Sequence, residues 1–133
     1  MAIRLYHDSG GTNEITSGDP DIHRNAVTEG SNSESIEEIF LLTDDSALTY
    51  ENVSISQQGS PSSAEYDNIY VDYNTSSDFS SISIGTQTSL NLSDGDYGTV
   101  VSVYRRVTVE NVQNPFKSEA EVYHRVQRDD YVK

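Results

Sequence analysis

The chain has 133 residues, 22 of them acidic and 8 basic, which gives a net charge of −14 at pH 7, and it contains no cysteine. This length fits one domain with a buried core, and without cysteine neither disulfides nor a cysteine-based zinc site can form. The negative charge argues against nucleic acid as a partner. No apolar run approaches the roughly 18 residues of a membrane span, and the N-terminus lacks the pattern of an export signal, so we expect no membrane partner.

The basic residues are an unusual selection. Lysine occurs only at Lys117 and Lys133, the other six basic residues are arginine, and Asp, Glu, Ser and Thr dominate the polar positions. This profile resembles that of proteins from salt-loving archaea. Dense carboxylates repel one another in dilute buffer, whereas molar salt shortens the Debye length to about 3 Å and removes most of that repulsion. We therefore expect a halophilic protein, with an ordinary acidic protein as the alternative.

The first predicted element is a strand over Ala2–Tyr6, with Ile3 and Leu5 on one face. The glycine pair at 10–11 indicates a turn rather than a phosphate-binding loop, because no helix pattern follows it. Residues 13–30 contain an Asp-Pro step and two glycines, which favour a loop or an edge strand. We expect three of its side chains to point inward: Ile15, Ile22 and Val27.

Helix and strand compete over Ser33–Asp45. The spacing of Ile36, Ile39 and Phe40 suits a helix, and Ser33 suits a helix start. The set Ile36, Phe40 and Leu42 suits the inner side of a strand. We favour the strand, because most other segments of the chain show strand patterns.

Three further segments alternate between apolar and polar residues. Tyr50–Ser56 places Val53 and Ile55 inward. Tyr66–Tyr73 places Ile69, Val71 and Tyr73 on one face. Phe79–Leu92 suggests two short strands, the first with Ile82 and Ile84 on one side, joined by a bend at Gly85. The turn at 93–98 follows, and we expect Gly95 to supply a positive φ angle there.

The longest run of β-branched and aromatic residues, Gly98–Val112, predicts the central strand. Its solvated face would carry Ser102, Tyr104, Arg106, Thr108 and Glu110, and its buried face would carry Val101, Val103, Val107 and Val109. Arg105 shares the buried parity, so it needs a partner acid, a bulge or a sheet end. We expect the last element, Ser118–Arg128, to pair antiparallel with Val100–Val109. Its inward side would carry Ala120, Val122, His124 and Val126.

About seven strands with Gly, Asn, Asp, Ser and Pro turns predict an all-β fold, a single antiparallel β-sandwich of immunoglobulin-like topology over residues 1–133. The Cys and Trp marks of true immunoglobulin domains are absent, so this expectation concerns architecture alone. The extended segments 1–25 and 129–133 are candidate arms for neighbouring subunits, with simple fraying as the alternative.

The sequence offers no anchor for catalysis. His7, His23 and His124 lie far apart, and none belongs to a metal or nucleophile motif. We therefore expect a protein that is not an enzyme, with no catalytic residues and no cofactor. Paired aspartates at turns are weak calcium candidates, for which ordinary turn formation is the favoured alternative. These are Asp44, Asp45, Asp94 and Asp96.

Tyrosine is abundant, with nine in the chain. Sheet packing accounts for most tyrosines in such a fold, but an exposed group of them would form an aromatic face for a protein partner. The candidates for that contact are Tyr66, Tyr70, Tyr104 and Tyr123.

Two regions, Ile3–Asp21 and Tyr97–Gln127, resemble small β-sandwich virion proteins of tailed double-stranded DNA viruses. The matching residues are Tyr6, Asp8, Ser9, Thr12, Glu14, Pro20, Tyr104, Arg105, Val107 and Val109. With the acidic composition, the resemblance implies a haloarchaeal virion protein, assembled in the host cytoplasm, that decorates or cements the capsid. Its implied partners are the major capsid protein or other virion proteins, and copies of itself in a homo-oligomer. A tail, collar or baseplate component, or a glycan-binding adhesin module, are the alternatives.

Overall fold

The structure is a computed structural model that describes residues 3–15, 21–24, 30, 32–57, 66–112 and 119–133. Within these ranges the secondary structure is entirely β, and no helix that could span a membrane is found. The strands are β1 (Ile3–Tyr6), β2 (Glu14–Ile15), β3 (Asp21–Arg24), β4 (Ser33–Thr43), β5 (Leu48–Gln57), β6 (Tyr66–Asn74), β7 (Ser89–Asn91), β8 (Val101–Val112), β9 (Glu119–Val122) and β10 (His124–Val132).

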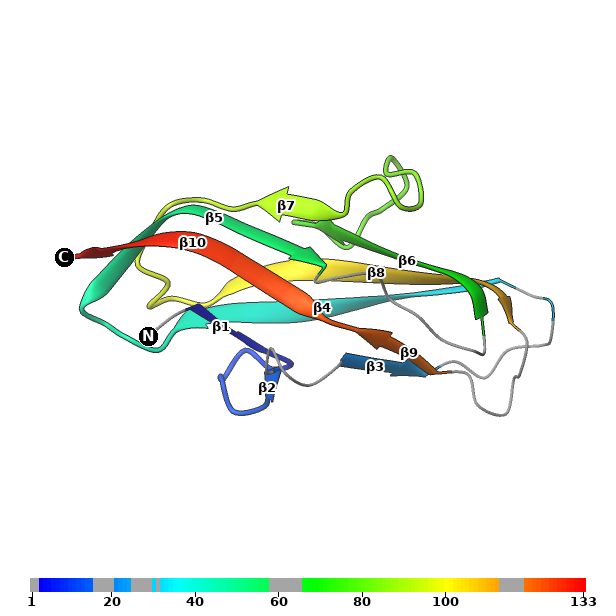
Figure 1. The fold of residues 1–133 in the computed structure, drawn as a ribbon. Helices are drawn as coiled ribbons and strands as arrows, with labels where there is room; N and C mark the ends of the chain where they lie inside the picture. The colour runs from blue at the N-terminus through cyan, green and yellow to red at the C-terminus, as the bar shows by residue number, and fades with distance from the viewer. Residues whose placement is uncertain (1–2, 16–20, 25–29, 31, 58–65, 113–118) are drawn as a thin grey trace.

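Two antiparallel sheets form the body of the molecule (Figure 1). The first has five strands in the order β2-β1-β4-β8-β6, and the second has three in the order β10-β5-β7. A separate pair, β3-β9, lies beside them. Buried side chains from both sheets form one core between them, so the expected antiparallel β-sandwich is confirmed. The described ranges hold ten strands rather than about seven, because they include three short additional strands, β2, β3 and β9.

The strand order has an immunoglobulin-like part. The sequence β1-β4-β8-β6 reproduces the A-B-E-D order of one immunoglobulin sheet, and the neighbours β5 and β10 correspond to strands C and F. β7 departs from that plan, because it pairs with the other edge of β5 through Ile55 and Leu90. The chain crosses between the two sheets at each step from β4 to β8, and again between β8 and β10.

Alternation predicted most of the core correctly. Val103, Val107 and Val109 of β8 are fully buried. The same holds for the inward residues predicted on β5 and β6, of which Val53, Ile55, Val71 and Tyr73 are buried and Ile69 packs against the core. Ile15 and Val122 are buried as well. Val27 lies outside the described residues, as do Pro20 and Lys117, and the side chains of Ile22, His23, Tyr66 and Ala120 are not described.

β4 is a strand, but the prediction of its inner face was wrong. Ile39 and Leu41 are fully buried, whereas Ile36 is 41% exposed. The antiparallel register fixes this choice, because Ile39 and Leu41 stand opposite Val103 and Val101 of β8. Apolar residues occupy both faces of β4, so the sequence pattern alone does not distinguish the inner face from the outer one.

The predicted partner of the central strand was also wrong. β8 lies between β4 and β6, while β9 pairs with β3 and β10 pairs with β5. Residues Val122 and His124 do point inward, but they face the core from across the sandwich. A strand that pairs with β8 and a strand in the facing sheet both place alternate apolar residues in the core. The sequence pattern therefore does not distinguish the two positions, which explains the error.

Two expectations between β6 and β8 need correction. Residues 79–88 form turns rather than a strand, and Ile84 is 49% exposed. Gly85 does bend the chain, with φ +76°. Gly95 does not adopt a positive φ, whereas Tyr97 does, with φ +56°. The buried Tyr97 ring packs edge-on against Tyr50 at 6.1 Å, and this burial offsets the cost of the unusual backbone angle.

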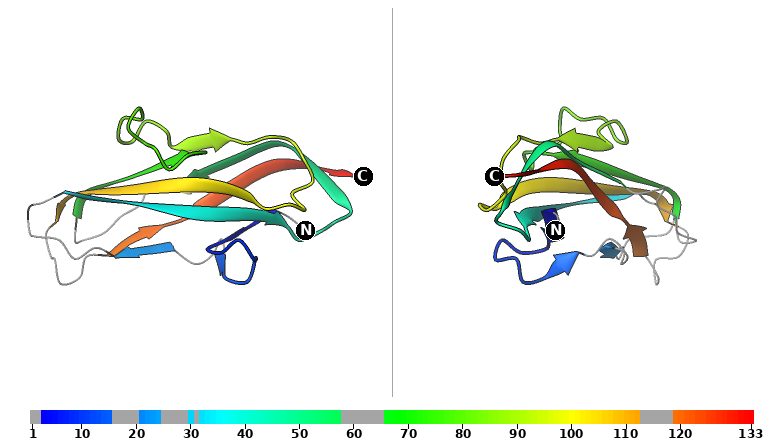
Figure 2. Two further views of the ribbon diagram at one scale, coloured as in Figure 1. Left: turned by 180° about the vertical axis from the view of Figure 1, so that it is seen from behind. Right: turned by 60° about the vertical axis from the view of Figure 1, so that its left-hand side comes forward.

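Both segments considered as arms contain strands of the sandwich. Ile3 and Leu5 are buried where β1 pairs with β4. At the other end, β10 continues through a register shift after Gln127 to Val132, which stands opposite Leu48 of β5. The described parts of these segments are therefore held in the sheets, with the two ends of the chain near the same end of the molecule (Figure 2).

Candidate functional site

Among the described residues, the most buried ion pair joins Asp72 of β6 to Arg106 of β8. The two residues are register partners, and Asp72 Oδ2 lies 2.8 Å from Arg106 Nη2. Both belong to the outward parity of their strands, yet both are buried. The expectation that this face of β8 is solvated was therefore wrong at Arg106, and also at Thr108, which is buried.

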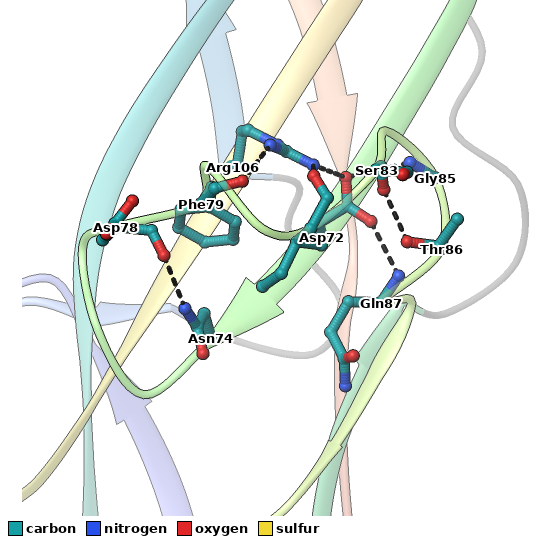
Figure 3. A network of polar contacts seen from close by, with 10 residues as sticks. Asp72, Asn74, Asp78, Phe79, Ser83, Gly85, Thr86, Gln87 and Arg106 are labelled. Carbon is teal, nitrogen blue, oxygen red and sulfur yellow. Dashed lines mark hydrogen bonds and ion pairs between the residues drawn. The ribbon is translucent and has the colours of Figure 1, made fainter.

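The cover over this pair is the loop of residues 79–87 (Figure 3). Asp72 accepts hydrogen bonds from the backbone N–H groups of Gly85 and Gln87, at 3.0 and 2.9 Å. Arg106 donates to the backbone oxygen of Ile82 at 3.1 Å, and its guanidinium lies 4.8 Å from the centre of the Phe79 ring. Charge-assisted bonds of this kind are stronger than neutral ones. The ion pair therefore acts as a clamp that holds the loop on the sheet.

A second polar chain runs through the interior, between the two sheets. Arg105 is fully buried, and its Nη2 donates to Glu37 Oε2 at 2.7 Å. Glu37 stands directly opposite Arg105 on β4, its side chain is 43% exposed, and its other oxygen lies 3.4 Å from His7 Nδ1. Burial lowers the pKa of Arg105 to about 10. The partner acid required by the predicted strand faces is thus present, and the assignment of Arg105 to the inner face is confirmed.

His124 of β10 continues this chain into the second sheet. Arg105 Nη1 lies 3.4 Å from His124 Nε2, and the Tyr73 hydroxyl lies 2.7 Å from Nδ1. Arginine only donates hydrogen bonds, so Nε2 must be the unprotonated nitrogen and Nδ1 carries the proton toward the Tyr73 oxygen. Burial, followed by the charge of Arg105, lowers the pKa of His124 to about 3. Burial also raises the pKa of Tyr73.

This inner chain of hydrogen bonds connects strands of the two sheets. General acid–base chemistry needs a group whose pKa lies near the working pH, whereas His124 stays neutral across that range. Arg105 donates a hydrogen bond to His124, and His124 donates one to Tyr73, inside the core. Glu37 is the member of the chain that reaches solvent. The arrangement ties β4, β6 and β8 of one sheet to β10 of the other.

The calcium candidates lie in turns and ion pairs. Asp44 binds Arg4 at 2.8 Å, Asp45 accepts the N–H of Ala47, and Asp94 accepts the N–H of Asn52. Asp96 accepts the N–H of Gly98 and pairs with Lys133, and these contacts lower its pKa. Across the described ranges, no three or more His, Asp or Glu side chains converge as metal ligands do.

The tyrosine candidates do not converge. Tyr70 and Tyr104 share the outer face of the five-stranded sheet, but Tyr70 stands opposite Thr108, four residues along β8 from Tyr104. The charge of Glu110 raises the pKa of Tyr70, and a hydrogen bond to Glu38 raises that of Tyr104. Tyr123 lies between β9 and β10, away from this sheet, and the side chain of Tyr66 is not described.

Several residues of the virion-protein resemblance have structural contacts. Asp8 accepts hydrogen bonds from the Thr12 hydroxyl and from the N–H groups of Thr12 and Asn13, which lowers its pKa. Glu14 pairs with Arg4 at 2.8 Å. The early Asp, Thr and Glu positions therefore close the β1–β2 turn.

Sequence reasoning missed the Asp72–Arg106 clamp and the role of Glu37. Asp72 sits between Val71 and Tyr73, an apolar setting that is itself a weak sign of a buried acid. Its partner was assigned to the solvated face, and a covering loop leaves no periodic signal. Glu37 shares parity with Ile39 and Leu41, so it became visible as an inward acid only once the face of β4 was known.

No family model, curated protein or solved structure matches this chain. The fold and its contacts define the class directly: an antiparallel β-sandwich whose buried charged side chains join strands and hold a loop.

Proposed function

We propose that this chain is a non-enzymatic structural protein of a virion, which decorates or cements the capsid shell through protein–protein contacts at high salt. The observation that carries the proposal is that the buried polar side chains bind one another or hold a loop. Arg105, His124 and Tyr73 bind one another, and Asp72 with Arg106 clamps a loop. These contacts give the interior charges a structural use, which supports a role that depends on the surface of the protein. The resemblance of Ile3–Asp21 and Tyr97–Gln127 to virion β-sandwich proteins supports the same role.

The charge supports the high-salt setting. A net charge of −14 on 133 residues repels itself in dilute buffer. Molar salt screens exposed charges separated by more than about 3 Å. The folded chain should therefore be more stable in molar KCl than in dilute buffer, and a thermal midpoint that did not rise with salt would contradict the halophilic part of the proposal.

The deciding experiment places the protein in a particle. Purified virions of the virus that encodes the chain are labelled with an antibody against it and imaged. Label over the head supports the capsid role, and label on the tail supports a tail, collar or baseplate component. If the protein is absent from particles and the purified chain retains glycans on an array, the adhesin alternative replaces the virion role. Homo-oligomer formation is measured separately by sedimentation in molar KCl.

A further inference from the structure

β4 carries apolar residues on the face that points away from the core. Ile36, Phe40 and Leu42 alternate with the buried Ile39 and Leu41, and they are exposed or half-buried. They do not belong to the cluster that fills the sandwich. A strand in a sheet that faces water on one side normally alternates apolar with polar residues. A strand apolar on both faces indicates that its second face is covered by something else.

Neighbouring strands widen this apolar surface. Tyr6 of β1 stands opposite Phe40. Tyr104 of β8 stands opposite Glu38, which precedes Phe40 on the same outer face of β4. We call these five residues the outer stripe: Tyr6, Ile36, Phe40, Leu42 and Tyr104. In the view from behind, β4 and β8 lie in front of β10 (Figure 2, left).

The fold covers the Leu42 end of the outer stripe but leaves the Ile36 end open. At one end, a Cβ on Gly11 would lie 2.9 Å from Leu42 Cδ1, so the β1–β2 turn rests on Leu42. On the other side, the loop of residues 79–87 covers Arg106, the register partner of Ile36. Ile36 itself remains 41% exposed. An aromatic and aliphatic centre of this kind is typical of the core of a protein interface.

The surroundings of the outer stripe are acidic. Glu34 and Glu38 flank Ile36 on β4, and Glu110 lies farther along the same face of β8. None of these three acids forms an ion pair with a base in the part of the chain that the structure describes. Arg4 and Arg106, on the same face, are already paired with Glu14, Asp44 and Asp72. The face therefore presents apolar side chains with Glu38 between Ile36 and Phe40, and among the described residues no base pairs with these carboxylates.

We propose that the outer stripe is the docking surface for a virion partner whose contact surface has an apolar centre rimmed by Lys or Arg. This inference deepens the proposed function and rests on it. A second copy of the chain does not fit as the occupant, because two such faces would oppose glutamates to glutamates. A second copy also has few bases left to form a basic rim, because five of its eight are already in ion pairs, namely Arg4, Arg105, Arg106, Arg128 and Lys133.

The test is binding of purified chain variants to capsid shells stripped of this protein, in molar KCl. The double variant Ile36→Thr/Phe40→Thr removes the apolar centre, and we expect binding to weaken roughly tenfold or more. Its control is Ile84→Thr, the same change at a similarly exposed isoleucine outside the outer stripe, which should bind as the unmodified chain does. Equal thermal midpoints of the variants show that any loss is not caused by unfolding.

A charge variant tests the partner's chemistry. Glu34→Gln should weaken binding by about two- to fivefold, whereas Glu51→Gln, at an exposed position on β5 in the other sheet, should not. Tighter binding of Glu34→Gln would show an acidic partner and overturn the basic rim. If the free chain is an oligomer that Ile36→Thr/Phe40→Thr dissociates, a second copy covers the face and the inference is wrong.

The two proposals fail differently. Shells that do not bind the unmodified chain overturn the capsid role, and with it this partner for the outer stripe. Shells that bind the unmodified chain and the Ile36→Thr/Phe40→Thr variant equally well overturn the docking surface alone.

Discussion

Asp72 and Arg106 face each other on β6 and β8 and form a 2.8 Å ion pair that is almost completely removed from solvent. The pair also holds the loop of residues 79–87, through the N–H groups of Gly85 and Gln87 and the oxygen of Ile82. Loss of one charge would leave the other buried and uncompensated, which makes this pair the most sensitive point on the outer face.

The variant Asp72→Asn should lower the free energy of unfolding by about 3–5 kcal/mol, because Arg106 loses its counter-charge while remaining buried. Chemical denaturation measures the loss. Amide hydrogen exchange at Gly85 and Gln87 should accelerate more than exchange in β5. The exposed Asp78→Asn change, directly before the loop, is the control, and a comparable loss in both variants would show that the clamp has no special role.

His124 should make the protein less stable as the pH falls. Its pKa in the folded state is about 3, below the ordinary value of 6.5, so the unfolded chain takes up a proton first. The stability that depends on the neutral imidazole is complete above pH 6.5 and is lost progressively toward pH 3. The slope should approach about 1.4 kcal/mol for each pH unit in that range. Denaturation midpoints at several pH values measure it.

The informative part of that range lies above about pH 4.5, where carboxylates of ordinary pKa remain mostly ionised. The variant His124→Gln should lose the slope there, whereas the half-buried His7→Gln should keep it. A slope that persists in His124→Gln would assign the pH dependence to other groups.

The hydroxyl of Thr108 is buried and has no hydrogen-bond partner among the described residues. The near-isosteric change Thr108→Val should therefore raise the free energy of unfolding by about 1 kcal/mol, because an unsatisfied polar group is removed. Thr43→Val is the matched control. The Thr43 hydroxyl lies 2.6 Å from the Tyr50 hydroxyl, so the same change there should destabilise the protein. Destabilisation by both variants would mean that Thr108 has a partner.

Gly85 and Gly95 should respond differently to alanine. At Gly85, φ is +76° and a Cβ would lie 2.9 Å from Tyr70 Cδ1. Gly85→Ala should therefore cost roughly 1–2 kcal/mol from the backbone alone. At Gly95 there is no atom within 4 Å of the added Cβ and φ is not positive, so Gly95→Ala should change stability by less than about 0.5 kcal/mol. Thermal or chemical denaturation of both variants gives the comparison.

Local alternation predicted which residues of β5, β6 and β8 are inward, because each of these strands has one apolar face. It failed at β4, where Ile36 and Ile39 are equally apolar and only pairing with β8 separates them. It also failed for the neighbours of β8, because strand order depends on crossovers between sheets rather than on local pattern. The expected β-sandwich followed from the number of strands and their turns, which do not depend on that order.

The polar contacts were predictable only in part. Arg105 on an inward parity required an acid, and Glu37 supplies it. The Asp72–Arg106 clamp was not predicted, because a loop that folds over a sheet face depends on the three-dimensional path of residues 79–87. The tyrosines were grouped by residue type, whereas the sheet register separates Tyr70 from Tyr104 and leaves Tyr123 elsewhere.

The pairing of β10 with β5 has a consequence for synthesis. His124 meets Gln57 and Val132 meets Leu48, so the second sheet joins β10 to a strand that is translated much earlier. Until β10 emerges from the ribosome, the inward residues Tyr50, Val53 and Ile55 lack their edge neighbour, and the unfinished chain exposes apolar surface. A nascent chain stalled before His124 should therefore be protease-sensitive and recruit chaperones.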